Sequence, residues 1–197
     1  MSRLDQLRKN YQRLCGLPWD DKLAGPQRVW MAVYDKEDER KLRLRIGLFE
    51  EATHHARHRW EAIDLTDAFP DWLCSPPYQD YAASYFESPT LLGKAPLAAF
   101  KNHVAGRINQ VLDTCRSPEE TVVAVYGIAS LFGFVRVSEV IPLVESHIKG
   151  RLLVLFPGVY EQNNYRMLDA GDGWNYLAIP ISSSEGQGLR ITIANPG

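Results

Sequence analysis

Five consecutive apolar residues, Leu152 to Phe156, most constrain the fold of this chain. An uninterrupted apolar run is typical of a strand buried on both faces, as in the middle of a parallel sheet. Pro157 and Gly158 then predict the end of the strand, and a polar stretch precedes a second apolar run that starts at Tyr176. Open α/β sheets place their binding surface on such loops. The alternative is an ordered turn whose Asn and Asp side chains only cap backbone groups.

Strand and helix patterns alternate along the rest of the chain, which favours a parallel sheet. Apolar runs predict strands at 29–34, 62–65, 122–126, 152–156 and 176–181. Apolar residues at helical spacing predict helices at 2–15, 35–59, 96–115 and 137–147. A C-terminal hairpin is predicted over 175–194, with 189–193 antiparallel to 176–181. We therefore predict a single α/β domain over 1–197, with a mostly parallel sheet of about five strands flanked by helices.

This predicted sheet resembles a nucleotide-binding sheet without its phosphate loop. The turn after the first predicted strand, 34–38, contains three acids and no glycine, so it would repel phosphate. The one Gly-Lys pair, Gly93-Lys94, has Ser88 where a phosphate loop has glycine and Ala95 where it has Ser or Thr. We expect no nucleotide and no other cofactor.

Overall charge and cysteine content narrow the class of protein. The 22 basic and 24 acidic residues nearly cancel, so no global field attracts nucleic acid or an anionic membrane. The sequence shows neither the apolar core of a signal peptide nor the roughly eighteen apolar residues of a membrane span, which predicts a cytoplasmic protein. Cys15, Cys74 and Cys115 are widely separated, which disfavours a disulfide framework and a zinc site.

Histidines on the predicted helix 35–59 are candidate metal ligands. Glu50, His54 and His58 recur at every fourth position, with His55 adjacent, so the pattern places three ligands on one helix face. A complete site would need a further ligand from a distant segment. A solvated helix face near a C-terminus, where the helix dipole favours imidazolium, explains the same residues. We predict no metal site there.

Two alternative functions depend on charged residues. Glu161, Asp169 and Asp172 would bind a divalent cation in a metal-dependent hydrolase. However, acids in a loop rich in Asn and Gly more often form turns, and the chain shows no nucleophile and base at a hydrolytic spacing. A DNA-binding accessory subunit is the other alternative, and its affinity would fall steeply with salt. Its basic residues would be Arg136, Lys149, Arg151 and Arg166.

The polar stretch also carries a family resemblance. Phe-Pro-Gly-x-Tyr-x-x-Asn-Asn-Tyr-Arg-x-Leu-Asp from Phe156, followed by Asp-Gly-Trp-Asn-Tyr-Leu-Ala-Ile-Pro-Ile from Asp172, is similar to the C-terminal signature of the BrxB family of bacterial BREX phage-defence systems. The resemblance covers most of the chain, includes Ala-Val-Tyr-Gly-Ile-Ala-Ser-Leu-Phe-Gly-Phe at 124–134, and is strongest after residue 120. The sequence departs from the pattern at Gly171, where a basic residue is expected.

Membership of a multi-protein complex, without established catalytic chemistry, is what this resemblance implies. The implied partners are other BREX subunits: the alkaline-phosphatase-like subunit, the AAA-type ATPase or the adenine methyltransferase. We therefore predict a non-enzymatic interaction subunit that binds its partner through residues 157–175, here termed the signature loop. The predicted surface comprises Tyr160, Asn164, Tyr165, Arg166, Asp172, Trp174 and Asn175.

Within the signature loop, Tyr165, Arg166 and Trp174 are the predicted anchors, because Tyr, Arg and Trp dominate binding energy at interfaces. The Asn and Asp residues are expected to hold the loop in shape. Trp174 directly precedes an apolar run, so an inward orientation is the alternative. The segment 69–96, rich in proline and aromatic residues, is the other candidate docking surface.

Overall fold

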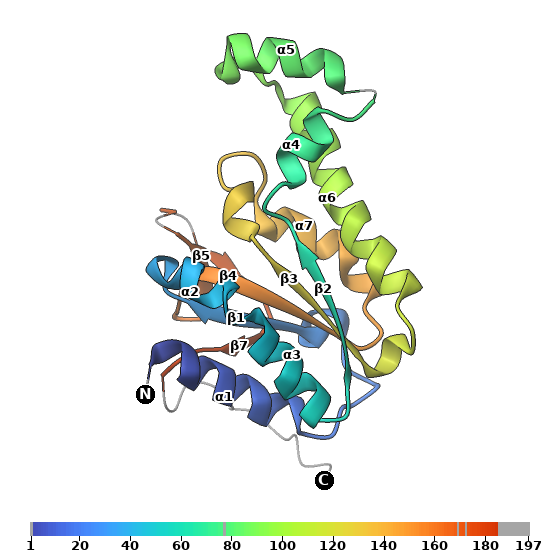
Figure 1. Cartoon of the computed structure of the whole chain (residues 1–197), viewed down its shortest axis with the longest axis vertical. Helices are drawn as coiled ribbons and strands as arrows, with labels where there is room; N and C mark the ends of the chain where they lie inside the picture. Colours follow the sequence, from blue (N-terminus) through green and yellow to red (C-terminus); the bar gives the residue numbers. More distant parts are fainter. Residues whose placement is uncertain (1, 77, 169, 172, 185–197) are drawn as a thin grey trace.

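The computed structural model describes residues 2–76, 78–168, 170–171 and 173–184. Its helices are α1 (Arg3–Cys15), α2 (Glu39–Arg43), α3 (Ile46–His55), α4 (Ala68–Leu73), α5 (Gln79–Glu87), α6 (Lys94–Thr114) and α7 (Val137–Val144). Its strands are β1 (Val29–Tyr34), β2 (Arg59–Asp64), β3 (Thr121–Tyr126), β4 (Arg151–Glu161), β5 (Asn164–Met167), β6 (Trp174–Asn175) and β7 (Ile179–Ile181). The predicted α/β class is confirmed (Figure 1).

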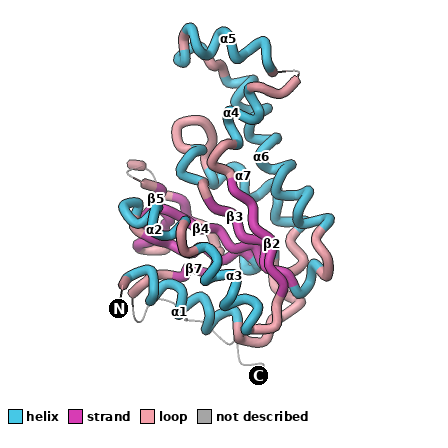
Figure 2. Tube along the Cα trace, viewed as in Figure 1, coloured by secondary structure: helices cyan, strands magenta, loops and turns pink. Residues whose placement is uncertain are grey.

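The described strands form one seven-stranded mixed sheet, in contrast to the five predicted. Its main path has the order β2-β3-β4-β1-β7, and each neighbouring pair on that path is parallel. β5 pairs antiparallel with the outer half of β4 and with β6. Figure 2 shows the strands between two sets of helices. Segments 29–34 and 152–156 are neighbours in this sheet and pair parallel.

Successive residues of β1 enter opposite hydrophobic clusters, which explains its continuous burial. Trp30 belongs to the cluster that α1 and α3 cover, whereas Met31 belongs to the cluster under α4, α6 and α7. Ser2 caps the start of α1, and its hydroxyl accepts a hydrogen bond from the amide of Asp5. The sheet is therefore a central layer with helices on both faces.

β4 does not end at Pro157 and Gly158, so this boundary prediction was wrong. Pro157 still lies opposite Tyr34 in the parallel ladder, and its carbonyl accepts a hydrogen bond from the Leu168 amide at 2.9 Å. Gly158 lets β5 pair closely with the continuing strand, since it has no Cβ atom. A Cβ atom there would lie 2.1 Å from the carbonyl oxygen of Arg166. Proline and glycine here permit the close passage of β5 instead of stopping the strand.

The predicted helix 35–59 is also wrong as one element, because it consists of a 3-10 turn followed by α2 and α3. Leu42 and Phe49 are both buried, but they lie on different helices. The segment ends at Arg57, whose φ of 64° is in the left-handed region, and Arg59 already belongs to β2. The apolar periodicity indicates which residues are buried against the sheet. It does not show whether they belong to one helix or to two.

The remaining elements differ mainly at their ends. Helix 96–115 corresponds to α6, helix 137–147 to α7 plus a 3-10 turn, and segment 69–96 contains the short helices α4 and α5. Of the predicted strand 176–181, only 179–181 is a strand, and it pairs parallel with β1. The returning strand 189–193 of the predicted C-terminal hairpin lies outside the described residues. Over the described ranges, the helices are too short or too polar to span a membrane.

Candidate functional site

The signature loop is a β-hairpin extension of the central strand. Gln162 and Asn163 form its tip, and both have positive φ, as a two-residue turn between twisted strands requires. Asn164 Nδ2 donates to the Gln162 carbonyl at 3.1 Å, which fits the predicted shape-holding role of Asn164. The Tyr160 hydroxyl donates to Asn163 Oδ1 at 3.2 Å. Polar side chains thus stabilise the tip of the hairpin.

The two faces of this hairpin differ in chemistry. Tyr160 lies opposite Tyr165, and their ring centroids are 4.6 Å apart. Val159 lies opposite Arg166, and because side chains alternate along a strand, this pair is on the other face. Arg166 is therefore exposed on the outer face, away from the aromatic rings.

Aromatic rings on the inner face form a continuous series. Tyr165 contacts Phe156 at 5.9 Å and Trp174 at 6.2 Å between ring centroids. Trp174 stacks on Tyr176 at 4.3 Å with an interplanar angle of 19°. The Tyr176 hydroxyl donates to Glu145 Oε1 at 2.5 Å, and burial raises the pKa of Tyr176, with the Glu145 carboxylate adding to the shift. These contacts fix the inner face to the rest of the domain.

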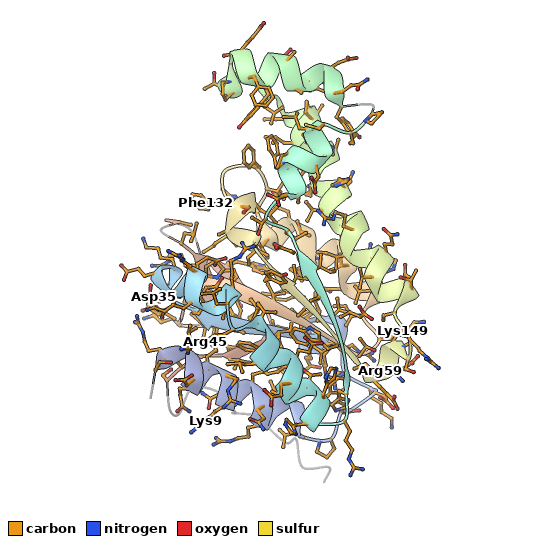
Figure 3. All side chains as sticks on the ribbon, in the orientation of Figure 1. Lys9, Asp35, Arg45, Arg59, Phe132 and Lys149 are labelled. Carbon is orange, nitrogen blue, oxygen red and sulfur yellow. The ribbon has the colours of Figure 1, made fainter. Side chains whose placement is uncertain are left out.

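Residues 132–139, from the loop after β3 into the first turn of α7, form the facing wall. Gly133 has a φ of 87°, which allows the chain to turn there. Phe134 stacks on Phe69 of α4 at 4.0 Å, so this wall is anchored to the helical layer. Phe132 is 49% exposed, and Figure 3 shows it at the end of the sheet nearest α4 and α5.

A cavity of about 780 Å³ lies between this wall and the inner face of the hairpin. We term it the aromatic cleft, lined by 132–139 on one side and by Phe156, Tyr165, Met167, Trp174 and small residues of the signature loop on the other. Among the described residues of its lining, Arg136 and Glu139 are charged. The lining thus combines aromatic rings with polar and charged side chains, which suits a peptide segment that presents both kinds of group.

Tyr165 is buried, although it was predicted to be a surface anchor. Its side chain is 1% exposed, and its hydroxyl donates to the Ala178 carbonyl at 3.0 Å. Burial raises the pKa of Tyr165 above its ordinary value. The residue forms the floor of the cleft and ties β5 to the segment before β7, so it is not a surface anchor.

The other predicted surface residues are distributed around the hairpin. Trp174 is half-buried with its ring in the cleft, so both orientations considered from the sequence are partly correct. Asn175 is exposed at the cleft. Asp172 lies outside the described residues. Phe132 and Phe134 were missed as site residues, although two phenylalanines around a glycine in an apolar stretch were a usable signal.

The structure separates the histidines of the candidate metal set. Glu50, His54 and His55 are exposed on α3, whereas His58 follows the helix and stacks on Trp19 at 3.6 Å between ring centroids. Within the part of the chain that is described, there is no group of three or more His, Cys, Asp or Glu able to hold a metal ion. Of the acidic loop set, Glu161 is exposed at the end of β4, and Asp169 lies outside the described residues.

Arg151 was grouped with possible DNA contacts, and this assignment was wrong. Its side chain is 4% exposed and lies over Trp19 and Trp30, with its guanidinium carbon 4.6 and 5.8 Å from the respective ring centroids. Its Nη1 donates to the Gly150 carbonyl at 2.9 Å. Burial lowers the pKa of Arg151 to about 10. This guanidinium is part of the core and cannot reach a nucleic acid.

A smaller cavity, of about 380 Å³, lies at the carboxyl end of β1. Its position corresponds to that of a phosphate site in nucleotide-binding sheets. Asp35 and Asp38 line it, and Asp38 is 6% exposed and held by Lys41 at 2.9 Å. The backbone amide of Glu37 is the main cause that lowers the pKa of Asp35. Arg3 and Lys36 line the same cavity, and Arg3 forms ion pairs with Asp35 at 3.2 Å and Asp38 at 3.6 Å, so the lining is mixed in charge.

Comparison of the chain with protein-family models, curated proteins and solved structures found no match.

Proposed function

We propose that this chain is a non-catalytic interaction subunit of a BREX-type phage-defence complex, and that its aromatic cleft holds a segment of another subunit. One observation carries the proposal. The two stretches that resemble the BrxB family, 124–134 and the signature loop, are far apart in the sequence but meet around one cavity. Its candidate partners are the alkaline-phosphatase-like subunit, the AAA-type ATPase and the adenine methyltransferase, in the cytoplasm.

The cleft has the size and chemistry of a peptide-docking site. Its volume, about 780 Å³, is within the roughly 300–1,000 Å³ of ordinary ligand pockets. Phe132 presents a half-exposed ring at one wall, and Trp174 presents an indole at the other. Aromatic side chains dominate binding energy when a partner removes them from water. The interaction needs no metal, cofactor or catalytic group.

Phe132 offers the cleaner test of the cleft, because it is half exposed and its truncation removes little packing. Trp174 stacks on Tyr176, so its truncation lowers stability as well. Tagged wild-type, Phe132→Ala and Arg166→Ala chains would be purified from cells that carry the complete defence system. Mass spectrometry would quantify the co-purified subunits, and thermal melting would check each fold.

We expect Phe132→Ala to lose the partner at an unchanged melting temperature, and Arg166→Ala to retain it, because Arg166 is on the outer face. Loss only with Arg166→Ala would move the interface to the outer face and support the predicted anchoring role of Arg166. Retention by both variants would contradict the cleft and favour the segment 69–96. Failure of the wild-type chain to recover any subunit would refute the interaction function.

A further inference from the structure

An arm formed by α4, α5 and the first turns of α6 projects beyond the sheet, and α5 lies across its end (Figure 1). The side chains of α5 are exposed or half-buried throughout the helix. Tyr81 is 45% exposed and Phe86 is 74% exposed. Large apolar side chains are thus presented at the point of the molecule furthest from the chain's described core.

One face of α5 is used to hold the arm together. Tyr78, immediately before the helix, contacts Trp72 at 4.7 Å, and Tyr85 contacts Phe69 at 5.2 Å between ring centroids. Ala82 packs against the same hydrophobic cluster. Positions 78, 82 and 85 are spaced as one helix face, so the opposite face of α5 is turned outward. Its outward orientation is therefore fixed by packing.

The outward face has an ordered pattern. At about 100° per residue, Tyr81 and Phe86 lie about 140° apart across the packed face and about 220° apart across the outward face, one on each flank of the helix. Asp80 and Glu87 lie between them on the crest, and both are exposed. Small residues at 83–84 occupy the rest of the crest. The helix therefore presents an acidic crest between two aromatic flanks.

Charge along this part of the chain has a single sign. No Lys or Arg occurs between Arg59 and Lys94, whereas six acidic residues do. They are Glu61, Asp64, Asp67, Asp71, Asp80 and Glu87. Asp64 and Asp71 pair with Arg43 and Arg107 of other elements, so the charge that α5 itself presents is that of Asp80 and Glu87. This charge is complementary to a basic protein surface.

We propose that α5 docks as a helix into a groove of a partner protein, with apolar walls that cover Tyr81 and Phe86 and a Lys- or Arg-bearing floor that meets Asp80 and Glu87. Helices dock into grooves through spaced apolar anchors in this way. The small residues 83–84 allow the floor to approach the crest closely. This inference rests on the proposed interaction function and adds a contact separate from the aromatic cleft.

Site-specific photo-crosslinking in cells that carry the complete defence system tests α5 and the cleft separately. p-Benzoylphenylalanine would replace Tyr81, Phe86, Phe132 or Leu44 in turn. Leu44 is the control, because it is 82% exposed and apolar but lies between α2 and α3. We expect positions 81 and 86 to crosslink to one partner subunit, at apolar residues that flank Lys or Arg, and position 44 to give no such product.

The acidic crest is tested by Asp80→Lys combined with Glu87→Lys, with Ser84→Ala as the matched control on the same face. We expect the charge reversal to lower the crosslink yield at position 86 at least tenfold and Ser84→Ala to leave it unchanged. All variants would be checked by thermal melting, because these side chains are exposed and should not affect the fold. An unchanged yield after charge reversal would overturn the basic floor.

The four crosslinking positions separate the two proposals. Products at position 132 without products at 81 and 86 would overturn the α5 inference and leave the cleft supported. Products at 81 and 86 alone would support α5 and overturn the cleft. The absence of products at all three positions would overturn both. Crosslinks from position 86 to nucleic acid or to a second copy of this chain would also overturn the α5 inference.

Discussion

Replacement of Tyr165 with Phe isolates one buried hydrogen bond that holds the cleft floor in place. The hydroxyl donates to the Ala178 carbonyl at 3.0 Å, and the side chain is 1% exposed. Tyr165→Phe preserves the ring contacts but leaves a buried carbonyl without this donor. Leaving a buried polar group unpaired costs about 1–3 kcal/mol. For a domain of this size, 1 kcal/mol shifts the melting temperature by about 2–4 °C, so we expect a decrease of about 2–12 °C.

Tyr160→Phe is the matched control, because Tyr160 is the cross-strand neighbour of Tyr165. Its hydroxyl bonds to the side chain of Asn163 at the exposed hairpin tip, where water replaces a lost donor. We expect a change below about 0.5 kcal/mol for this variant. Thermal and urea unfolding, followed by circular dichroism, would compare the two. Equal stabilities of the two variants would refute the assignment of Tyr165 as a structural residue of the cleft floor.

Three further predictions concern ligands, pH and backbone packing. Millimolar ATP or GTP should leave the melting temperature unchanged, whereas binding at ~100 times the dissociation constant would add about 2.7 kcal/mol and raise it by several degrees. Burial, with help from nearby Arg151, lowers the pKa of His58 below 6.5 in the folded protein. As the pH drops, His58 is therefore protonated in the unfolded state at a higher pH than in the folded state. The free energy of unfolding should then decrease as the pH drops below about 6.5. His58→Phe should flatten this fall between pH 7 and 5 in thermal melts, and an identical slope would contradict the assignment. Gly158→Ala should lower the free energy of unfolding in urea by about 1–3 kcal/mol, because the new Cβ would lie 2.1 Å from the Arg166 carbonyl oxygen. Gly171→Ala is the control, and it should leave the stability unchanged because a Cβ there would have nothing within 4 Å.

The core strands could be predicted from the sequence because a strand that is buried on both faces consists of consecutive apolar residues. The runs 29–34 and 122–126 correspond closely to β1 and β3. The same reasoning failed where Pro157 and Gly158 continue a strand, since their usual effect on isolated strands was overridden by the neighbouring β5. A local pattern cannot show that a second strand passes within contact distance.

The sequence indicated one wall of the candidate cleft but not the other. The signature loop does form one wall of the cleft, yet its partner wall at 132–139 became visible only when β3 and β4 were placed side by side. Tyr165 was assigned to the surface because residue type alone does not report side-chain orientation. The strand register decides this orientation, because a shift of one residue would place Arg166 on the inner face and Tyr165 on the outer face.

The continuity of β4 has a consequence for the kinetics and entropy of binding. One uninterrupted strand of 11 residues begins in the buried sheet and ends in the hairpin. The hairpin wall therefore cannot swing away without disturbing ladder hydrogen bonds of the domain centre. A partner would meet a preorganised cleft and lose little conformational entropy in ordering it. Association should then resemble rigid-body docking, and amide exchange in the hairpin wall should slow only slightly on binding.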